Sequence, residues 1–190
     1  MRLTVPNVRM AFPNIWTARK NVGDDGKVTY SFDGLFILTP DHPSLKELRA
    51  AFAAAASEKW GDKSPAILQA LIAQDRTPLY NGARKAEYDG FEGNFYISAR
   101  SKVRPNVKDK DGVTTLAEAD GRPYSGCYVN LIGLEIYGFQ HAKFGKRICA
   151  QLRGIQFLRD GDAFAAGKPA DDNEFGDVGD TGAAETDPLA

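Results

Sequence analysis

The clearest strand pattern in the chain is Asn94-Phe95-Tyr96-Ile97-Ser98-Ala99-Arg100-Ser101-Lys102-Val103-Arg104. Its odd positions are apolar or small, and its even positions are aromatic, polar or basic. Successive side chains of a strand point to opposite faces of the sheet. The segment therefore predicts a strand with one face in the core and one exposed face. That exposed face carries, in order, Tyr96, Ser98, Arg100, Lys102 and Arg104.

The exposed face suits a polyanion, because no acid interrupts its basic residues. From Tyr96 to Arg104 it spans roughly 26 Å. Phosphates could contact Arg100, Lys102 and Arg104 while a base stacks on Tyr96, and such stacking contributes about 1–3 kcal/mol per base whatever the sequence. An ordinary solvated sheet face has a similar pattern, so the basic face is a hypothesis that needs support from the rest of the chain.

Before this segment, the pattern predicts a long hairpin and two helices. Arg2–Phe12 is strand-like but contains Pro6, so it is expected to be an edge strand or to contain a break. Lys27–Thr39 alternates as its partner strand. Ser44–Lys59 has helical spacing, with Ser44 as its predicted cap, and Pro65 begins a second helix that reaches about Gln74.

After this segment, Tyr124–Phe139 and Arg147–Leu158 are each predicted as one strand. Strands outnumber helices, and strands and helices do not alternate. The expected fold is mainly β with an α insertion: an OB-like antiparallel β-barrel with a helical insertion between the second and third strand regions. Periodicity alone does not separate an OB-like barrel from other small barrels or sandwiches.

Charge divides the chain into a basic body and an acidic tail. Residues 1–159 hold 23 Lys and Arg against 16 Asp and Glu, whereas residues 160–190 hold one Lys against nine acids. We expect residues 1–165 to form one domain and residues 166–190 to form a disordered acidic tail. A basic body indicates a nucleic-acid partner, and the tail could compete for the same surface or bind other proteins.

Other basic residues also lie near aromatic residues. Tyr80 precedes Arg84 and Lys85, Tyr137 precedes Lys143, and Trp16 precedes two basic residues. Each pairing alone is weak, since aromatic residues usually belong to the core. Together with the exposed face they complete the predicted DNA-binding set, which consists of Trp16, Arg84, Lys85, Tyr96, Arg100, Lys102, Arg104, Tyr137 and Lys143.

Catalytic and cofactor motifs are absent from the sequence in any strong form. It has no phosphate-binding glycine loop and no Cys/His spacing for zinc, so no catalytic residue, metal or cofactor is expected. Cys127 and Cys149 are expected to be free buried thiols. Two rivals stay open: a metal-dependent nuclease that uses Asp109, Asp111 or Asp160, and a structural or decoration protein.

No apolar run is long enough to span a membrane, and the N-terminus lacks a secretory signal, so a cytoplasmic protein is expected.

Three motifs, the first of which overlaps the strand quoted above, give the chain a family resemblance. They are Gly93–Lys102 followed by Arg104-Pro105, Tyr124-Ser125-Gly126-Cys127-Tyr128-Val129-Asn130, and Gly154–Gly161. In this order and spacing they resemble a tailed-phage family, long catalogued as a domain of unknown function, whose members are single-stranded-DNA-binding proteins with an OB fold. The resemblance covers most of residues 2–165.

The resemblance implies a protein that coats single-stranded DNA during phage replication or recombination, in the host cytoplasm. It also implies an acidic C-terminal tail that contacts phage or host replication proteins. A homodimer or a cooperative assembly on DNA is left open. The family does not fix which aromatic residues stack on bases, so the predicted DNA-binding set rests on the residue pattern.

Overall fold

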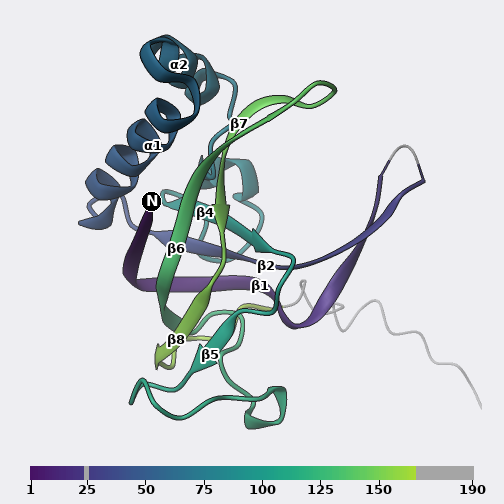
Figure 1. Ribbon diagram of the computed structural model, residues 1–190. Helices are drawn as coiled ribbons and strands as arrows, with labels where there is room; N and C mark the ends of the chain where they lie inside the picture. Colours follow the sequence, from purple (N-terminus) through teal and green to yellow (C-terminus); the bar gives the residue numbers. More distant parts are fainter. Residues whose placement is uncertain (24–25, 166–190) are drawn as a thin grey trace, which may run out of the picture.

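The computed structural model describes residues 1–23 and 26–165 of the protein (Figure 1). The predicted tail, residues 166–190, lies outside the described residues. In chain order the elements are β1 (Arg2–Val22), β2 (Val28–Leu38), α1 (Ser44–Trp60), the 3-10 turn η1 (Gly61–Lys63), α2 (Ser64–Ala73), β3 (Leu79–Asn81), η2 (Gly82–Lys85), β4 (Phe95–Ser101), β5 (Asn106–Lys108), η3 (Glu118–Asp120), β6 (Tyr128–His141), β7 (Gly145–Gln151) and β8 (Gly154–Arg159).

The strands form a closed ring in the order β1-β2-β4-β7-β6, because β1 also pairs with β6. β8 and β5 continue the sheet from β6, and β3 pairs with β4. The prediction of a mainly β fold with a helical insertion is confirmed. The purely antiparallel expectation is wrong at two places, since β4–β7 and β5–β8 are parallel pairs.

The predicted N-terminal hairpin is confirmed, with β1 antiparallel to β2. β1 is longer than predicted and is no edge strand, because its first part pairs with β6 and its later part with β2. Pro6 lies where the β1–β6 register shifts, between Val5 and Val8, so the predicted break is present. Proline lacks the N–H that a regular ladder needs.

The two predicted helices are present, but α1 is capped differently. Ser44 makes no side-chain cap; instead its backbone N–H donates to Nδ1 of the buried His42, 3.2 Å away. The other ring nitrogen of His42 lies 3.0 Å from the carbonyl oxygen of Pro6. Because Nδ1 is an acceptor, Nε2 is the nitrogen that donates. His42 thus ties the start of α1 to the break in β1.

Helix α1 packs closely against β6. A Cβ added at Gly138 of β6 would lie 2.6 Å from Cβ of Lys59, so only glycine allows this approach. On α2, Leu71 is buried whereas Ile72 is exposed. No helix within the described ranges is both long enough and apolar enough to cross a bilayer.

The segment predicted as one strand, Arg147–Leu158, is two strands. β7 and β8 both pair antiparallel with β6, and together they follow it from His141 back to Tyr128. The interruption at Leu152 and Arg153 lies opposite Gly133, whose φ of +63° bends β6. The bend lets Leu152 donate its N–H to the carbonyl of Arg100, which joins β7 to β4 and closes the ring.

Two hairpin arms extend beyond the ring (Figure 1). One is the far end of β1 and β2, and the other is the far end of β6 and β7. In the view of Figure 1 both arms project to the right, away from α1.

Candidate nucleic-acid interface

The alternation in β4 places the basic residues as predicted over most of its length. Ile97, Ala99 and Ser101 are buried, whereas Arg100 and Lys102 are exposed. The strand ends at Ser101, three residues earlier than the pattern suggested. Tyr96, Ser98 and Arg100 therefore stand on the regular outer face of β4, and Lys102 follows directly after the strand.

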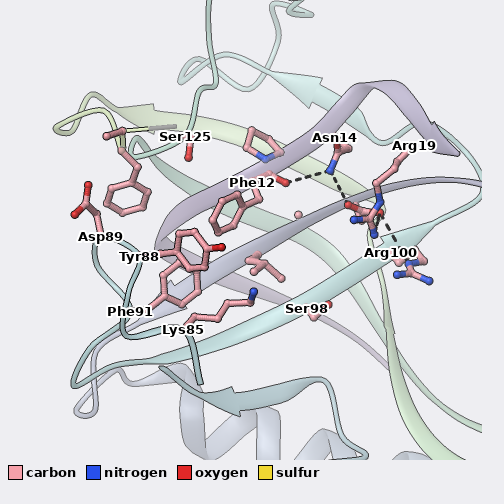
Figure 2. Close-up of a pocket in the computed structure, with 16 residues that line it drawn as sticks. Phe12, Asn14, Arg19, Lys85, Tyr88, Asp89, Phe91, Ser98, Arg100 and Ser125 are labelled. Atoms are coloured by element: carbon pink, nitrogen blue, oxygen red, sulfur yellow. Dashed lines mark hydrogen bonds and ion pairs between the residues drawn. The ribbon is translucent and has the colours of Figure 1, made fainter. Parts of the chain in front are cut away.

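On one side of this face lies a cleft of about 930 Å³, the first cleft (Figure 2). It is lined by residues of β1, β2 and β4, by the loop after η2, and by the segment after β8. Its charged residues are Arg19, Asp33, Lys85, Asp89 and Arg100, and its aromatic residues are Phe12, Tyr88, Phe91 and Phe164.

Rings gather at one end of the first cleft. Phe12 and Tyr88 meet edge to face with centroids 5.0 Å apart, and Nζ of Lys85 lies 5.7 Å from the centre of the Phe12 ring and 5.3 Å from that of Tyr88. Phe12 is 42% exposed and Tyr88 40% exposed. Figure 2 shows both rings and the Lys85 amine side by side, with Phe91 beneath them. A base could stack here next to a positive charge.

The backbone of Phe12 is strained. Its φ is +47°, a conformation that residues other than glycine rarely adopt. The same place is an irregularity in the β1–β2 register, between Ala11 and Asn14. Strain of this kind is retained where the surrounding structure enforces it, often at binding sites. Here it turns a large ring out of the strand and toward solvent.

On the other side of β4 lies the second cleft, of about 590 Å³. It lies between β4, β3, β6 and β7. Its cations are Arg100, Lys102 and Arg147, and its aromatic residues are Tyr80, Tyr137 and Phe139. Among the described residues that line it there is no acid.

The two clefts meet on β4, because Ser98 and Arg100 line both of them. We call the combined depression the groove. From the second cleft a row of rings continues along the β6–β7 arm: Phe139 and His141 are parallel with centroids 6.3 Å apart, and His141 and Phe144 are 4.9 Å apart. Lys143 ends this row, with Nζ 5.5 Å from the Phe144 ring centre.

The structure brings together four residues of the predicted DNA-binding set. Arg100 lies at the junction, Lys85 lines the first cleft, and Lys102 and Tyr137 line the second. Burial raises the pKa of the Tyr137 hydroxyl, so it stays protonated and can donate a hydrogen bond.

The expectation that Tyr96 presents an open ring is wrong. Tyr96 is only 5% exposed, and its ring stacks on Tyr80 of the short strand β3, with centroids 5.2 Å apart. Its pKa is raised, mainly by burial. The pattern failed here because Tyr96 packs in a small buried cluster with Ile37 and with Phe91, whose ring comes from the loop after η2 and lies 5.2 Å from that of Tyr96. Tyr80 is the ring that lines the second cleft in its place.

The other predicted residues lie outside both clefts. Arg84 makes an ion pair with Asp75, 2.8 Å apart, and its guanidinium lies 5.2 Å from the Tyr80 ring centre. Arg104 and Trp16 contact each other instead, with the guanidinium 5.1 Å from the ring centre. Lys143 lies at the turn of the β6–β7 arm, connected to the second cleft only through the row of rings.

The predicted DNA-binding set leaves out several rings and cations of the groove, among them Phe12, Arg19, Tyr88, Phe139 and Arg147. For Phe139 a signal was available, since it lies two residues from Tyr137 and so on the same face of β6. Nothing in the local pattern places Phe12 or Tyr88 in the groove. They meet only because a bulge in β1 and a loop after η2 fold toward each other.

The acids of the nuclease rival serve local structure. Asp109 forms an ion pair with Arg122, 2.7 Å apart, and the hydrogen bond from Arg122 holds the pKa of Asp109 below its usual value. Asp111 accepts hydrogen bonds within its own turn from Val113 and Thr114, and the hydroxyl of Thr114 lowers its pKa most. Asp160 accepts a hydrogen bond from the hydroxyl of Tyr124. Within residues 1–23 and 26–165, no group of three His, Cys, Asp or Glu residues is placed to hold a metal ion.

Known proteins resemble this chain in sequence and in fold. A curated relative, protein p50 of Acyrthosiphon pisum secondary endosymbiont phage 1, is 39% identical over 181 residues, which cover 94% of each chain. The solved structure of the single-stranded-DNA-binding protein from bacteriophage Enc34, in complex with single-stranded DNA, matches with a TM-score of 0.70 and 22% identity over 86% of this chain and 89% of that one.

A third match is gp2.5, a single-stranded DNA binding protein encoded by bacteriophage T7, with a TM-score of 0.55 and 9% identity over 98% of this chain and 99% of that one. At such low identities the solved structures support the fold alone. The family model described as Enterobacter phage Enc34, ssDNA-binding protein, matches residues 1–187. The chain therefore belongs to the family of the single-stranded-DNA-binding protein of Enterobacter phage Enc34.

Proposed function

We propose that this protein binds single-stranded DNA along the groove, with little preference for sequence. The observation that carries the proposal is the junction at Arg100, which joins two clefts that each contain exposed rings and cations. Family membership supports the same reading.

The chemistry of the groove fits an unpaired strand better than a duplex. Phosphates would pair with Arg100, Lys102 and Arg147, while bases stack on Tyr88 and Phe12 at one end and on Tyr137 and Phe139 at the other. Stacking on rings requires bases that are free of a partner strand, and it accepts any base. Cations that contact phosphates carry no sequence information.

The biological role follows from this activity. The protein would coat and protect single-stranded DNA during phage replication or recombination, in the host cytoplasm, as a binder and not an enzyme. Its acid-rich C-terminal residues would compete with DNA for the groove or contact replication proteins. Residues 166–190 lie outside the described structure, so this part of the proposal rests on their charge.

The test measures binding of the full chain to a labelled thymidine oligonucleotide, to a duplex and to RNA at two salt concentrations. We expect the single strand to bind most tightly, with an affinity that falls with salt by about 0.7 log units per log unit of salt for each phosphate neutralised. Preference for the duplex would contradict the proposal. Cleavage of the DNA with Mg²⁺ would favour the nuclease, and assembly without any affinity for DNA would favour a decoration protein.

A further inference from the structure

One buried acid lies where a DNA groove would be expected to exclude it. Asp33 of β2 lines the first cleft, and its side chain is only 12% exposed. A carboxylate at this place repels incoming phosphates. It is also costly to bury unless its oxygens are paired.

Both oxygens of Asp33 are paired. Nη2 of Arg19 lies 3.1 Å and Nε of Arg100 lies 4.0 Å from Oδ2. The hydroxyl of Ser31 donates to Oδ2 over 3.2 Å, and the side-chain amide of Asn14 donates to Oδ1 over 2.9 Å. Figure 2 shows Asn14, Arg19 and Arg100 converging on this point.

Strand register fixes this arrangement. Asn14 of β1 is directly opposite Asp33, and Asp33 is directly opposite Arg100 of β4. The carboxylate therefore sits at the centre of a row that crosses three strands. Arg19 reaches the same oxygen from the base of the β1–β2 arm, so Asp33 links the arm to the groove junction.

We propose that Asp33 is a positioning residue, which holds Arg19 and Arg100 together as a two-arginine site for phosphate. The side chains of Arg19 and Arg100 remain 48% and 60% exposed, so a phosphate can reach both while the carboxylate stays beneath them. Without the carboxylate, the two guanidinium groups would repel each other and move apart. DNA binding would then have to order both side chains, and the lost conformational entropy would lower the affinity. This inference rests on the proposed function, because it assigns a role within the same groove.

Charge alone and positioning predict opposite effects for Asp33→Asn. If Asp33 acts only through its charge, its removal makes the groove more positive and DNA binds more tightly. If Asp33 positions the arginines, its removal weakens binding by roughly three- to tenfold, a coupling usual within one charged network. The slope of log affinity against log salt concentration should also become shallower, by about 0.7, which is the contribution of one phosphate contact.

The experiment titrates a labelled thymidine oligonucleotide with the full-length wild type, Asp33→Asn, Arg19→Ala and the double variant at several salt concentrations. We expect weaker binding for Asp33→Asn and a much smaller effect of the same change in the Arg19→Ala background. Equal or tighter binding by Asp33→Asn, or an unchanged effect in the double variant, would overturn the proposal.

The matched control is Glu135→Gln. Glu135 of β6 also pairs with two arginines, Arg153 and Arg2, but it lines neither cleft. Its loss removes the same charge and should leave DNA affinity within about twofold, because neither Glu135 nor its two arginines line the groove.

Thermal melting checks that Asp33→Asn folds. If it does not fold, Arg19→Ala, Arg100→Ala and their double variant replace it. A site that holds both arginines together predicts losses of affinity that are not additive, and additive losses would refute the proposal. If the wild type does not bind single-stranded DNA at all, the proposed function fails instead.

Discussion

The two clefts of the groove differ in how they would hold a strand. In the first cleft the charges partly cancel, since Asp33 and Asp89 accompany three cations, and the open rings of Phe12 and Tyr88 are its main feature. In the second cleft the described lining residues include three cations and no acid. The first cleft is thus built for stacking and the second for phosphates, and Arg100 belongs to both.

This difference has a measurable signature. Contacts with phosphates release counterions, so their loss changes how affinity depends on salt. Stacking releases none, so its loss lowers affinity at every salt concentration alike. Variants in the two clefts should therefore separate along these two measurements.

The largest effect is expected from Arg100→Ala combined with Lys102→Ala. Both cations line the second cleft, and Arg100 also joins the clefts. We expect the salt slope to fall by about 1.4, and the affinity at 0.1 M salt to fall by roughly 25-fold, from two phosphates at 0.7 each. Fluorescence anisotropy over a salt series measures both.

The control for that pair is Lys46→Ala with Arg49→Ala, two exposed residues of α1 that line neither cleft. It removes the same net charge and should change the slope little. If both pairs reduce the slope equally, the effect is one of overall charge, and the groove is not the site.

A smaller effect is expected from Tyr88→Ala in the first cleft. Removal of one partly exposed ring should cost about 1 kcal/mol, or fivefold in affinity, at the low end for base stacking. The salt slope should not change. Tyr30→Ala, an exposed ring of the β1–β2 arm outside both clefts, is the control. If Tyr88→Ala changes the salt slope, the first cleft also binds phosphates, and the two clefts do not differ as described.

The second cleft could largely be predicted from sequence, and the first could not. Tyr137 lies on a strand and Lys102 directly follows one, and the period of two of these strands is set by local chemistry, so their faces follow from the pattern. Phe12 faces the groove through a register shift and a positive φ, and Tyr88 through a loop whose position depends on distant packing. No local pattern encodes such tertiary placements.

The same limit explains the errors in the fold. The β1–β2 hairpin and both helices were predictable, because turns, helix starts and periodicity are local signals. Tyr96 was misplaced because Phe91, from the loop after η2, packs against its ring and buries it. β7 and β8 were merged because the break between them is imposed by the pairing of Arg100 with Gln151 and the bend at Gly133.

A still smaller effect, largest at low salt, is expected from deletion of residues 168–190, which hold one Lys and seven Asp or Glu. The chain reaches the first cleft at Phe164, whose N–H donates to Ser125 and whose ring lies 4.2 Å from the guanidinium of Arg9. The seven acids follow Phe164 closely in the sequence, so they should compete with DNA for the first cleft. Deletion should therefore tighten DNA binding a few-fold, and salt should screen this increase in affinity.

The effects of the length and of the charge of residues 168–190 on DNA binding can be measured separately. A variant with the seven acids replaced by their amides keeps the length and should tighten binding as the deletion does. Unchanged or weaker binding by both variants would remove the competitor role and leave the first cleft to DNA alone.

The smallest effect is a change in the reactivity of Cys149, which lines the second cleft and is half-buried. Burial raises its pKa, so alkylation should be slow at neutral pH and faster in mildly alkaline buffer, where more thiolate forms. A saturating thymidine oligonucleotide should slow it several-fold by covering the cleft. Cys127 is buried, which raises its pKa to about 11, so it should react only after unfolding. Cys149→Ser identifies the labelled site. Equal alkylation rates with and without DNA would mean that the DNA does not cover the second cleft. The first cleft would then bind DNA by itself.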